Sequence, residues 1–395
     1  MTSTIRLPQR DRTFRTYAPG SGDRYPATAP PPRSRVPLAA VHVVADPLAD
    51  TTPAGPAVLD WEDTLAFRRY LWGLGLGVAE AMDTAQRGMG LDWETSAELI
   101  RRTVAEARAV GGRAVCGAQT DQLPPGSARS LREVEAAYEE QCAHVEGVGG
   151  QVVLMASREL CRIARGPDDY LQVYGRVLSQ LERPALVHWL GEVFDPQLRG
   201  YWGHEDLDAA SEVVLHLLTE HQDRIEGIKL SLLEQRREVE LRRRLPVGVR
   251  MFTGDDFDYP TTIAGDTSHH SDALLGALSL IAPAAAQAFS LLDAGDLAGF
   301  HRTLEPTVPL SRHVFGAPTF YYKTGVVFLA YLNGHQSHFR MVGGLESGRS
   351  IVHLAELFEL ADRADLLRDP DLAVERMRRV LAVAGVLEPR AATIG

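Results

Sequence analysis

The stretch Ile225–Leu230 reads Ile-Glu-Gly-Ile-Lys-Leu, a short apolar run that carries one lysine, Lys229, near its end. Such a run predicts a buried strand. A lysine at the carboxyl end of a buried strand is costly unless it pairs with a carboxylate, binds an anion or gives up its proton. Lys229 is therefore either a strand-end lysine that reaches solvent or a carboxylate, or a chemically reactive group.

The same unit of a short apolar run, a polar loop and an amphipathic helix recurs along the chain on both sides of this stretch. Eight such units in about 250 residues predict a closed (β/α)₈ TIM barrel. A doubly wound open sheet is the alternative fold, but no Gly-x-Gly-x-x-Gly follows the first run. The predicted strands are Val36–Val44, Gly77–Met82, Arg113–Gly117, Gln151–Met155, Ala185–Trp189, Ile225–Leu230, Val247–Phe252 and Ala273–Ile281. The predicted helices begin near Asp60, Asp92, Ser130, Asp168, Leu207 and Glu234.

Two further regions flank the barrel, which is predicted over residues 35–283. Residues 1–34 are rich in Arg, Pro, Ser, Thr and Gly and lack apolar periodicity, which predicts a poorly ordered arm or one that packs on a neighbouring subunit. After Pro283 the alternation stops, so residues 284–395 predict an all-helical C-terminal extension. Its expected helices are Ala284–Leu292, Leu297–Leu304, Val308–Phe315, Tyr322–Leu332, Ile351–Ala361 and Leu372–Ala384.

Composition excludes several classes of protein. The chain has 395 residues, a formal net charge of −11 and arginines scattered among acids, which argues against nucleic acid as a partner. No apolar run approaches the roughly 20 residues that span a bilayer, and the N-terminus lacks the apolar core of a signal peptide. Three widely spaced cysteines fit reduced thiols. We therefore expect a cytoplasmic protein without a membrane partner.

In a TIM barrel the reactive groups come from the carboxyl ends of the strands and the loops that follow. A lysine sunk in this mouth has a lowered pKa and can form a Schiff base with an aldehyde or ketone. The residues expected there are Asp83, Thr84, Gln119, Asp121, His188, Trp189, Lys229, Asp255 and Asp256. Less reactive roles stay open for some of them: Asp255 and Asp256 could form an Asx-turn and helix cap, and His188 could be a core histidine.

A metal site is a further alternative. Asp266, His269 and His270 are residue types that bind Zn²⁺ or Mn²⁺. Adjacent histidines in a strand or loop point in opposite directions, so only one of the two would be a ligand. We therefore predict neither a metal nor another cofactor.

These motifs resemble the dihydrodipicolinate synthase and N-acetylneuraminate lyase family of Schiff-base aldolases, of which the chain looks like a divergent, uncharacterised bacterial branch. The resemblance spans roughly residues 60–330. Gly227-Ile228-Lys229 is similar to the family's Gly-Ile-Lys, which implies that Lys229 forms the imine. Thr253-Gly254-Asp255-Asp256 is similar to its Ser-Gly-Asp-Asp, and the stretch from Gly276 to Phe315 resembles its passage into the C-terminal helices.

The chain departs from the family where that family binds pyruvate. The family's Gly-Thr-Thr-Gly-Glu is replaced by Asp83-Thr84-Ala85-Gln86-Arg87, so one hydroxyl is lost and a carboxylate that repels pyruvate is gained. The family's Tyr-Asn after strand five is His188-Trp189, and its Pro-Tyr-Tyr after strand four is Ala156-Ser157-Arg158. Histidine shuttles protons near neutral pH, so His188 can stand in for the tyrosine.

We therefore expect an enzyme, a Schiff-base-forming lyase (aldolase or dehydratase) that acts on a small polyhydroxylated carbonyl compound other than pyruvate. The expected roles are Lys229 as nucleophile, His188 as acid and base, and Thr84 as relay. Substrate-binding residues would be Asp83, Gln119, Gly254, Asp255 and Asp256. The alternatives are a metal-dependent sugar isomerase or epimerase and a non-catalytic metabolite-binding barrel. The resemblance also implies a homo-oligomer, either a dimer or a tetramer.

Overall fold

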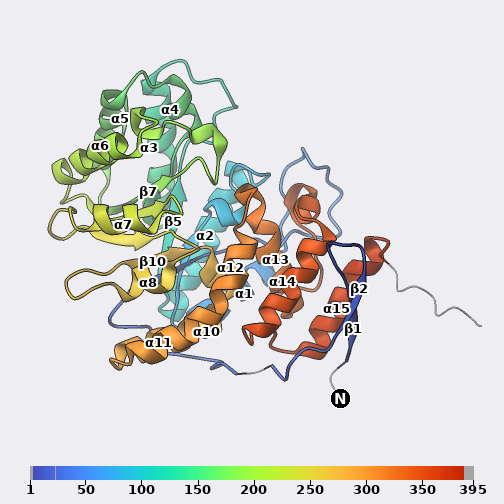
Figure 1. Ribbon diagram of the computed structural model, residues 1–395. Coiled ribbons are helices and arrows are strands. Elements are labelled where there is room, and N and C mark those ends of the chain that lie inside the picture. Colours follow the sequence, from blue (N-terminus) through green and yellow to red (C-terminus); the bar gives the residue numbers. More distant parts are fainter. Residues whose placement is uncertain (1–2, 23, 387–395) are drawn as a thin grey trace, which may run out of the picture.

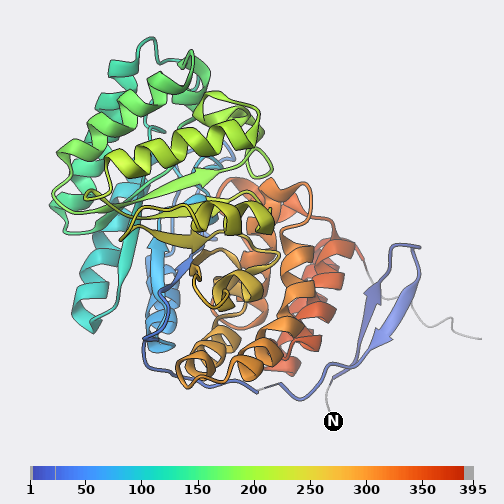
Figure 2. The same cartoon turned by 60° about the vertical axis from the view of Figure 1, so that its left-hand side comes forward.

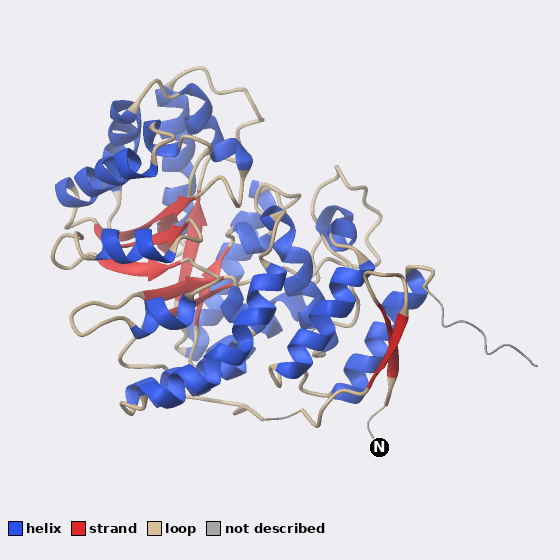
Figure 3. Cartoon of the chain, viewed as in Figure 1, coloured by secondary structure: helices blue, strands red, loops and turns tan. Residues whose placement is uncertain are grey.

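Eight parallel strands close into a barrel in a computed structural model, which describes residues 3–22 and 24–386 (Figures 1 and 3). Each barrel strand pairs in parallel with its two neighbours, and the last barrel strand in the sequence pairs with the first barrel strand. The predicted TIM barrel is confirmed. The strands are β3 (Pro37–Ala40), β4 (Gly77–Glu80), β5 (Ala114–Ala118), β6 (Gln151–Leu154), β7 (Ala185–Leu190), β8 (Ile225–Ser231), β9 (Arg250–Thr253) and β10 (Asp272–Leu275).

Helices cover the outer face of the barrel, and several of them start at a residue whose side chain caps the helix. The side chains of Asp60, Asp92 and Ser130 each accept a hydrogen bond from a backbone N–H three residues on, which satisfies a donor that the first helical turn leaves free. The helices are α1 (Trp61–Gly73), α2 (Trp93–Val110), α3 (Leu131–Gly147), α4 (Arg158–Ile163), α5 (Pro167–Gln180), α6 (Leu207–Glu220), α7 (Gln235–Arg242) and α8 (Tyr259–Ala264). Short 3₁₀ turns follow β4 and β7: η1 (Asp83–Ala85), η2 (Pro196–Leu198) and η3 (Tyr201–Gly203).

The barrel interior is a packed core rather than a channel. A cluster of apolar side chains, among them Leu38, Leu186, Phe252 and Leu274, fills its middle. Near the amino-terminal ends of the strands, an Arg113 Nη2 to Glu226 Oε1 bond of 2.8 Å ties β5 to β8. A packed interior leaves no passage through the barrel, and in TIM barrels the functional groups lie at the carboxyl ends of the strands.

The eighth strand is shorter than predicted. The sequence predicted a strand over Ala273–Ile281, but β10 ends at Leu275 and a short helix, α9 (Ala277–Leu280), follows. A Cβ on Gly276 would lie 2.8 Å from the Phe315 ring, so only glycine fits at the turn. The Asp256 carboxylate accepts the Ala277 N–H at 2.8 Å, which fixes the start of α9.

The C-terminal extension packs beside the barrel as a layer of helices, and it reaches the barrel mouth (Figure 2). Its central helix, α13 (Tyr322–Leu332), is buried along its whole length. The other helices are α10 (Ala282–Asp293), α11 (Leu297–Leu304), α12 (Val308–Val314), α14 (Ile351–Arg363) and α15 (Pro370–Val383), with 3₁₀ turns η4 (Glu305–Thr307), η5 (Thr319–Tyr321) and η6 (Val342–Gly348).

The N-terminal segment differs from the predicted poorly ordered arm. Its strands β1 (Ile5–Pro8) and β2 (Phe14–Tyr17) form an antiparallel hairpin beside α14 (Figure 1). Ile5 and Leu7 are buried, and Tyr17 Oη donates to Asp362 at 2.7 Å. The segment therefore packs on the chain's own extension, and a four-residue strand was too short for its alternation to stand out in the sequence. Residues 1–2 and 23 of the predicted arm, and residues 387–395 of the predicted extension, lie outside the described residues.

Within the described ranges, no helix is both long enough and apolar enough to span a bilayer.

Candidate active site

Lys229 lies inside the barrel near the carboxyl end of β8. It is in register with His188 of β7 and with Phe252 of β9. In-register neighbours in a parallel sheet point to the same face, and Phe252 belongs to the interior cluster. The Lys229 side chain therefore enters the barrel interior, where the residue is only 7% exposed. Burial lowers the pKa of Lys229, while the charges of Asp83 and Asp256 oppose that shift.

The loop after β4 brings Asp83 and Thr84 to the mouth. Ala81 has a positive φ of 51°, a conformation that costs energy for a residue with a Cβ and that turns the chain into η1. Thr84 is buried, and its Oγ1 lies 2.8 Å from the hydroxyl oxygen of Tyr322. Asp83 lines the cavity described below. Both residues lie at the mouth, as the sequence predicted.

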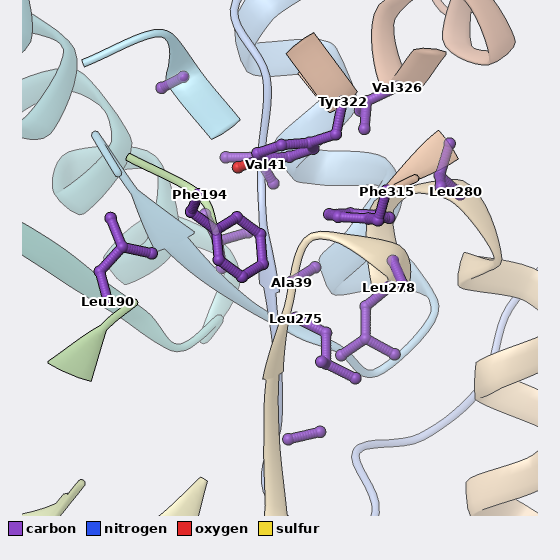
Figure 4. Close-up of a cluster of buried hydrophobic side chains, with 14 of the residues drawn as sticks. Ala39, Val41, Leu190, Phe194, Leu275, Leu278, Leu280, Phe315, Tyr322 and Val326 are labelled. Carbon is purple, nitrogen blue, oxygen red and sulfur yellow. The ribbon is translucent and has the colours of Figure 1, made fainter. Parts of the chain in front are cut away.

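Phe194, Phe315 and Tyr322 form an aromatic group within a cluster of buried apolar side chains (Figure 4). Tyr322 stacks on Phe315 with 4.5 Å between ring centroids, and Phe194 meets Tyr322 edge-on at 6.1 Å. Phe315 and Tyr322 come from the C-terminal extension, whereas Phe194 follows β7. No sequence pattern indicated that a tyrosine from this extension would meet Thr84.

The two aspartates after β9 have different surroundings. Asp255 Oδ1 accepts hydrogen bonds from the N–H groups of Phe257 and Asp258 at 2.8 and 3.2 Å, so Asp255 forms the Asx-turn that the sequence left open. Asp256 caps α9 and interacts electrostatically with Lys229. Burial raises the pKa of both carboxyls. Asp256 is thus the aspartate next to the lysine, and Asp255 shapes the loop.

Gly254 allows β8 and β9 to approach each other closely at their ends. A Cβ at this position would lie 2.2 Å from Ser231 Oγ and 2.6 Å from the Leu230 carbonyl oxygen. Its backbone N–H donates to that same carbonyl at 2.8 Å. The glycine therefore keeps Ser231 in place beside His188.

His188 is fully buried and hydrogen-bonded. Its Nε2 lies 3.1 Å from Ser231 Oγ, and its Nδ1 has no hydrogen-bond partner among the described residues. Burial and the neighbouring Lys229 hold the pKa of His188 well below its usual range. The imidazole is therefore neutral at pH 7, which corrects the expectation that it titrates near neutrality. The adjacent Trp189 faces outward, with 6.4 Å between its ring centroid and that of Trp202.

A cavity of about 600 Å³ opens at the barrel mouth, between the loops that follow β4, β5, β6 and β7. Neither Lys229 nor His188 lines it, whereas Asp83 does. Its polar lining consists largely of paired charges: Arg87 Nε donates to Asp121 at 2.7 Å and Arg158 Nε donates to Asp195 at 2.6 Å. Gln119 also lines the cavity, and its amide donates to Asp121 at 2.9 Å. Such a lining offers many hydrogen-bond donors and acceptors without a large excess of one charge.

A second lysine, Lys323, lies at the same mouth. It is 3% exposed and follows Tyr322 at the start of α13, and its Nζ donates to the Phe320 carbonyl at 3.2 Å. Burial lowers the pKa of Lys323 to about 8, while Asp83 and Asp195 raise it. The sequence interpretation missed this residue, although a signal was there: of 41 lysines and arginines, only Lys229 and Lys323 are lysines.

The Asp266, His269 and His270 group lies in the loop before β10, at the opposite end of the barrel from Lys229. Asp266 Oδ1 accepts hydrogen bonds from the N–H groups of Ser268 and His269, both at 2.9 Å. These bonds engage the carboxylate in the turn. No group of three or more His, Cys, Asp or Glu side chains suited to a metal ion occurs in the described part of the chain.

Comparison with solved structures places the fold among the dihydrodipicolinate synthases. YagE, a prophage protein of the dihydrodipicolinic acid synthase family from E. coli K12 in complex with pyruvate, is 13% identical, with a TM-score of 0.63 over 84% of this chain and 99% of that one. The synthase from Aquifex aeolicus is 13% identical, with a TM-score of 0.61 over 84% and 99%. The synthase from Bacillus clausii is 14% identical, with a TM-score of 0.61 over 82% and 96%. The resemblance expected from the sequence is therefore confirmed in the fold.

No curated protein matches the sequence. A family model does, and it extends from the first strand of the N-terminal hairpin to beyond the last helix. Since residues 5–386 match the model of the family described as "Protein of unknown function (DUF993)", the chain belongs to that family.

Proposed function

We propose that this protein is a Schiff-base-forming lyase, an aldolase or dehydratase, that acts on a small polyhydroxylated carbonyl compound other than pyruvate. The observation that carries the proposal is the position of Lys229, a buried amine inside the barrel mouth with a lowered pKa. A desolvated lysine is the form of this side chain that attacks carbonyl carbons. The likeness in fold to dihydrodipicolinate synthases supports the same reaction class.

In the proposed reaction, the neutral amine of Lys229 attacks the substrate's carbonyl carbon to give a carbinolamine. Protonation of its hydroxyl by a nearby acid and loss of that hydroxyl as water then give a protonated imine. In an aldolase, a base then removes the proton of the hydroxyl two carbons from the imine carbon. The C–C bond between the imine's α-carbon and the carbon that bears this hydroxyl breaks, and its electron pair moves to the imine nitrogen, giving an enamine and an aldehyde. Protonation and hydrolysis release the second product and restore Lys229. In a dehydratase, the enamine forms by loss of the α-proton and then expels the hydroxyl on the β-carbon as water.

The proton transfers are assigned to groups around Lys229. Asp256 has a raised pKa and interacts with the lysine, so it suits the role of acid and base. The paired hydroxyls of Thr84 and Tyr322 form a relay. The His188 imidazole stays neutral in this scheme, and its Nδ1 has no hydrogen-bond partner among the described residues.

The proposed substrate follows from the cavity lining. Asp83 lies in the loop that resembles the family's pyruvate-binding loop, so its carboxylate would repel that of pyruvate, and repulsion between like charges at an effective dielectric constant near 20 is on the order of a few kcal/mol. The paired Arg87–Asp121 and Arg158–Asp195 groups offer both donors and acceptors, which suits several hydroxyl groups. Gln119 adds an amide to this wall.

Turnover and binding test the proposal together. Purified protein is incubated with a panel of aldoses, ketoses and hydroxylated 2-keto acids, and new carbonyl products are detected as hydrazones by mass spectrometry. The protein should cleave or dehydrate at least one compound, and Lys229→Arg should abolish this. In calorimetry, pyruvate should bind at best weakly, and Asp83→Asn should strengthen its binding. Tight pyruvate binding by the unaltered protein would contradict the substrate assignment, and turnover that survives Lys229→Arg would contradict the mechanism.

A further inference from the structure

The only two lysines of the chain are both buried at the barrel mouth, where the charge of Asp83 acts on each of them. Lys229 comes from β8 and Lys323 from the C-terminal extension, and both are almost fully buried. Asp83 interacts electrostatically with each of them. Everywhere else in the chain the basic residue is arginine. The two positions that are lysine are therefore the two buried cations on which the Asp83 charge acts.

A hydrogen bond between the residue after Asp83 and the residue before Lys323 brings these two parts of the chain together. Thr84 follows Asp83, Tyr322 precedes Lys323, and the hydroxyls of Thr84 and Tyr322 are 2.8 Å apart. The Lys323 ammonium lies over the Tyr322 ring, 4.6 Å from its centroid, and 4.9 Å from that of Phe320. Two aromatic faces therefore hold the Lys323 ammonium, on the side of the mouth where Thr84 and Asp83 lie.

We propose that Lys323 is a positioning residue that balances the charge of Asp83 and thereby keeps Lys229 in its neutral, nucleophilic form. This inference rests on the proposed Schiff-base function. Only an unprotonated amine attacks a carbonyl, and a lone carboxylate beside Lys229 would hold the proton on it. A second cation on the same carboxylate opposes that effect.

The other charged groups around the two lysines leave this role to Lys323. Lys229 interacts electrostatically with Asp83 in the loop after β4, with Asp256 in the loop after β9 and with His188 in β7. Asp256 follows β9, the strand next to β8, and its carboxylate caps α9.

Lys323 interacts electrostatically with Asp83, Asp195 and Arg158. Arg158 and Asp195 form an ion pair with each other, with 2.6 Å between Nε and Oδ2. Asp83 is therefore the carboxylate that remains for Lys323 to balance.

The test is the pH dependence of imine formation at Lys229. Glycolaldehyde and cyanoborohydride trap the imine, and peptide mass spectrometry assigns it, because Lys229, Lys323 and the α-amino group are the only primary amines. Lys323→Met should raise the pH of half-maximal trapping by about one unit, which is about tenfold slower trapping at pH 7. Lys323→Arg keeps the charge and should restore the original midpoint. Asp83→Asn should shift the midpoint in the opposite direction.

The control for loss of a distant positive charge is Arg236→Met, since the Arg236 side chain is 90% exposed. An unchanged midpoint in folded Lys323→Met would overturn the inference, as would trapping on Lys323 instead of Lys229. If Lys323→Met does not fold, Asp83→Asn decides, because an unchanged midpoint in that variant removes the carboxylate from the argument. Absence of any Lys229 adduct in the unaltered protein would instead refute the proposed function, so the two failures are distinguishable.

Discussion

Thr84 and Tyr322 lie 238 positions apart in the sequence, and their hydroxyl groups share a buried hydrogen bond of 2.8 Å at the mouth of the barrel. Thr84 belongs to the turn after β4, and Tyr322 opens α13. The C-terminal extension therefore completes the candidate site as well as covering it. A barrel without this extension would lack both the tyrosine hydroxyl and the second lysine.

Tyr322→Phe tests this contribution. If the hydroxyl relays a proton, kcat for the substrate identified by turnover should fall by about 10²- to 10⁴-fold, the usual range for a lost acid or base. The free energy of unfolding should fall by only about 1 kcal/mol, because the ring stacked on Phe315 is kept. Tyr321→Phe is the matched control, since Tyr321 is the neighbouring and more exposed tyrosine. Equal kcat values for the two variants would remove Tyr322 from the relay.

His188→Phe tests the role of the buried histidine. We expect kcat to fall by about 10²- to 10⁴-fold while the melting temperature changes little, since phenylalanine fills a similar volume. Because burial keeps the pKa of His188 well below its usual range, the variant should not remove a titration near pH 6.5 from the rate profile. Ser231→Ala, which removes only the hydroxyl beside Nε2, is the companion variant. A protein that melts early but turns over normally would show that His188 is structural.

Glu238 on α7 makes stability depend on pH. Its carboxyl is buried and accepts hydrogen bonds of 2.7 Å from the hydroxyls of Thr253 and of Ser271, and burial raises its pKa from 4.5 to about 7. Since the folded-state pKa is above the unfolded one, the stabilisation is complete below pH 4.5 and is lost as the pH rises through 7.

Relative to Glu238→Gln, the unaltered protein should lose about 3 kcal/mol of unfolding free energy between pH 4.5 and pH 8, as measured by urea denaturation. Glu240→Gln, on the exposed side of the same helix, is the matched control. A difference between the unaltered protein and Glu238→Gln that stays constant across this range would contradict the assignment.

The barrel and part of its mouth could be predicted from the sequence because both depend on local patterns. Asp60 and Asp92 mark helix starts through their own side chains, and Leu207–Glu220 carries a clear apolar period that matches α6. Once eight parallel strands are expected, their carboxyl ends must meet at one face. Lys229, His188 and Asp83 could therefore be assigned to one mouth from the sequence alone.

The features of the site and the fold that the sequence did not reveal depend on tertiary packing. The helix Tyr322–Leu332 was predicted with its observed bounds, but its period says nothing about which strand ends it meets, so Tyr322 and Lys323 were missed. Asp255 and Asp256 are adjacent and chemically identical, and only the turn made by Asp255 reveals which of them interacts with Lys229. β10 ends where α9 begins, and α9 is capped by Asp256 from the loop after β9, a bond that no local pattern encodes.

Reductive trapping shows directly whether Lys229 forms an imine with a carbonyl compound. Folded protein is incubated with each compound of the carbonyl panel, reduced with borohydride and digested. The masses of the peptides that contain Lys229 and Lys323 are then measured by mass spectrometry. We expect an adduct on the Lys229 peptide with at least one hydroxylated aldehyde or ketone, and none at position 229 in Lys229→Arg. No adduct on Lys229 with any compound, in protein whose folding has been verified, would contradict the Schiff-base mechanism.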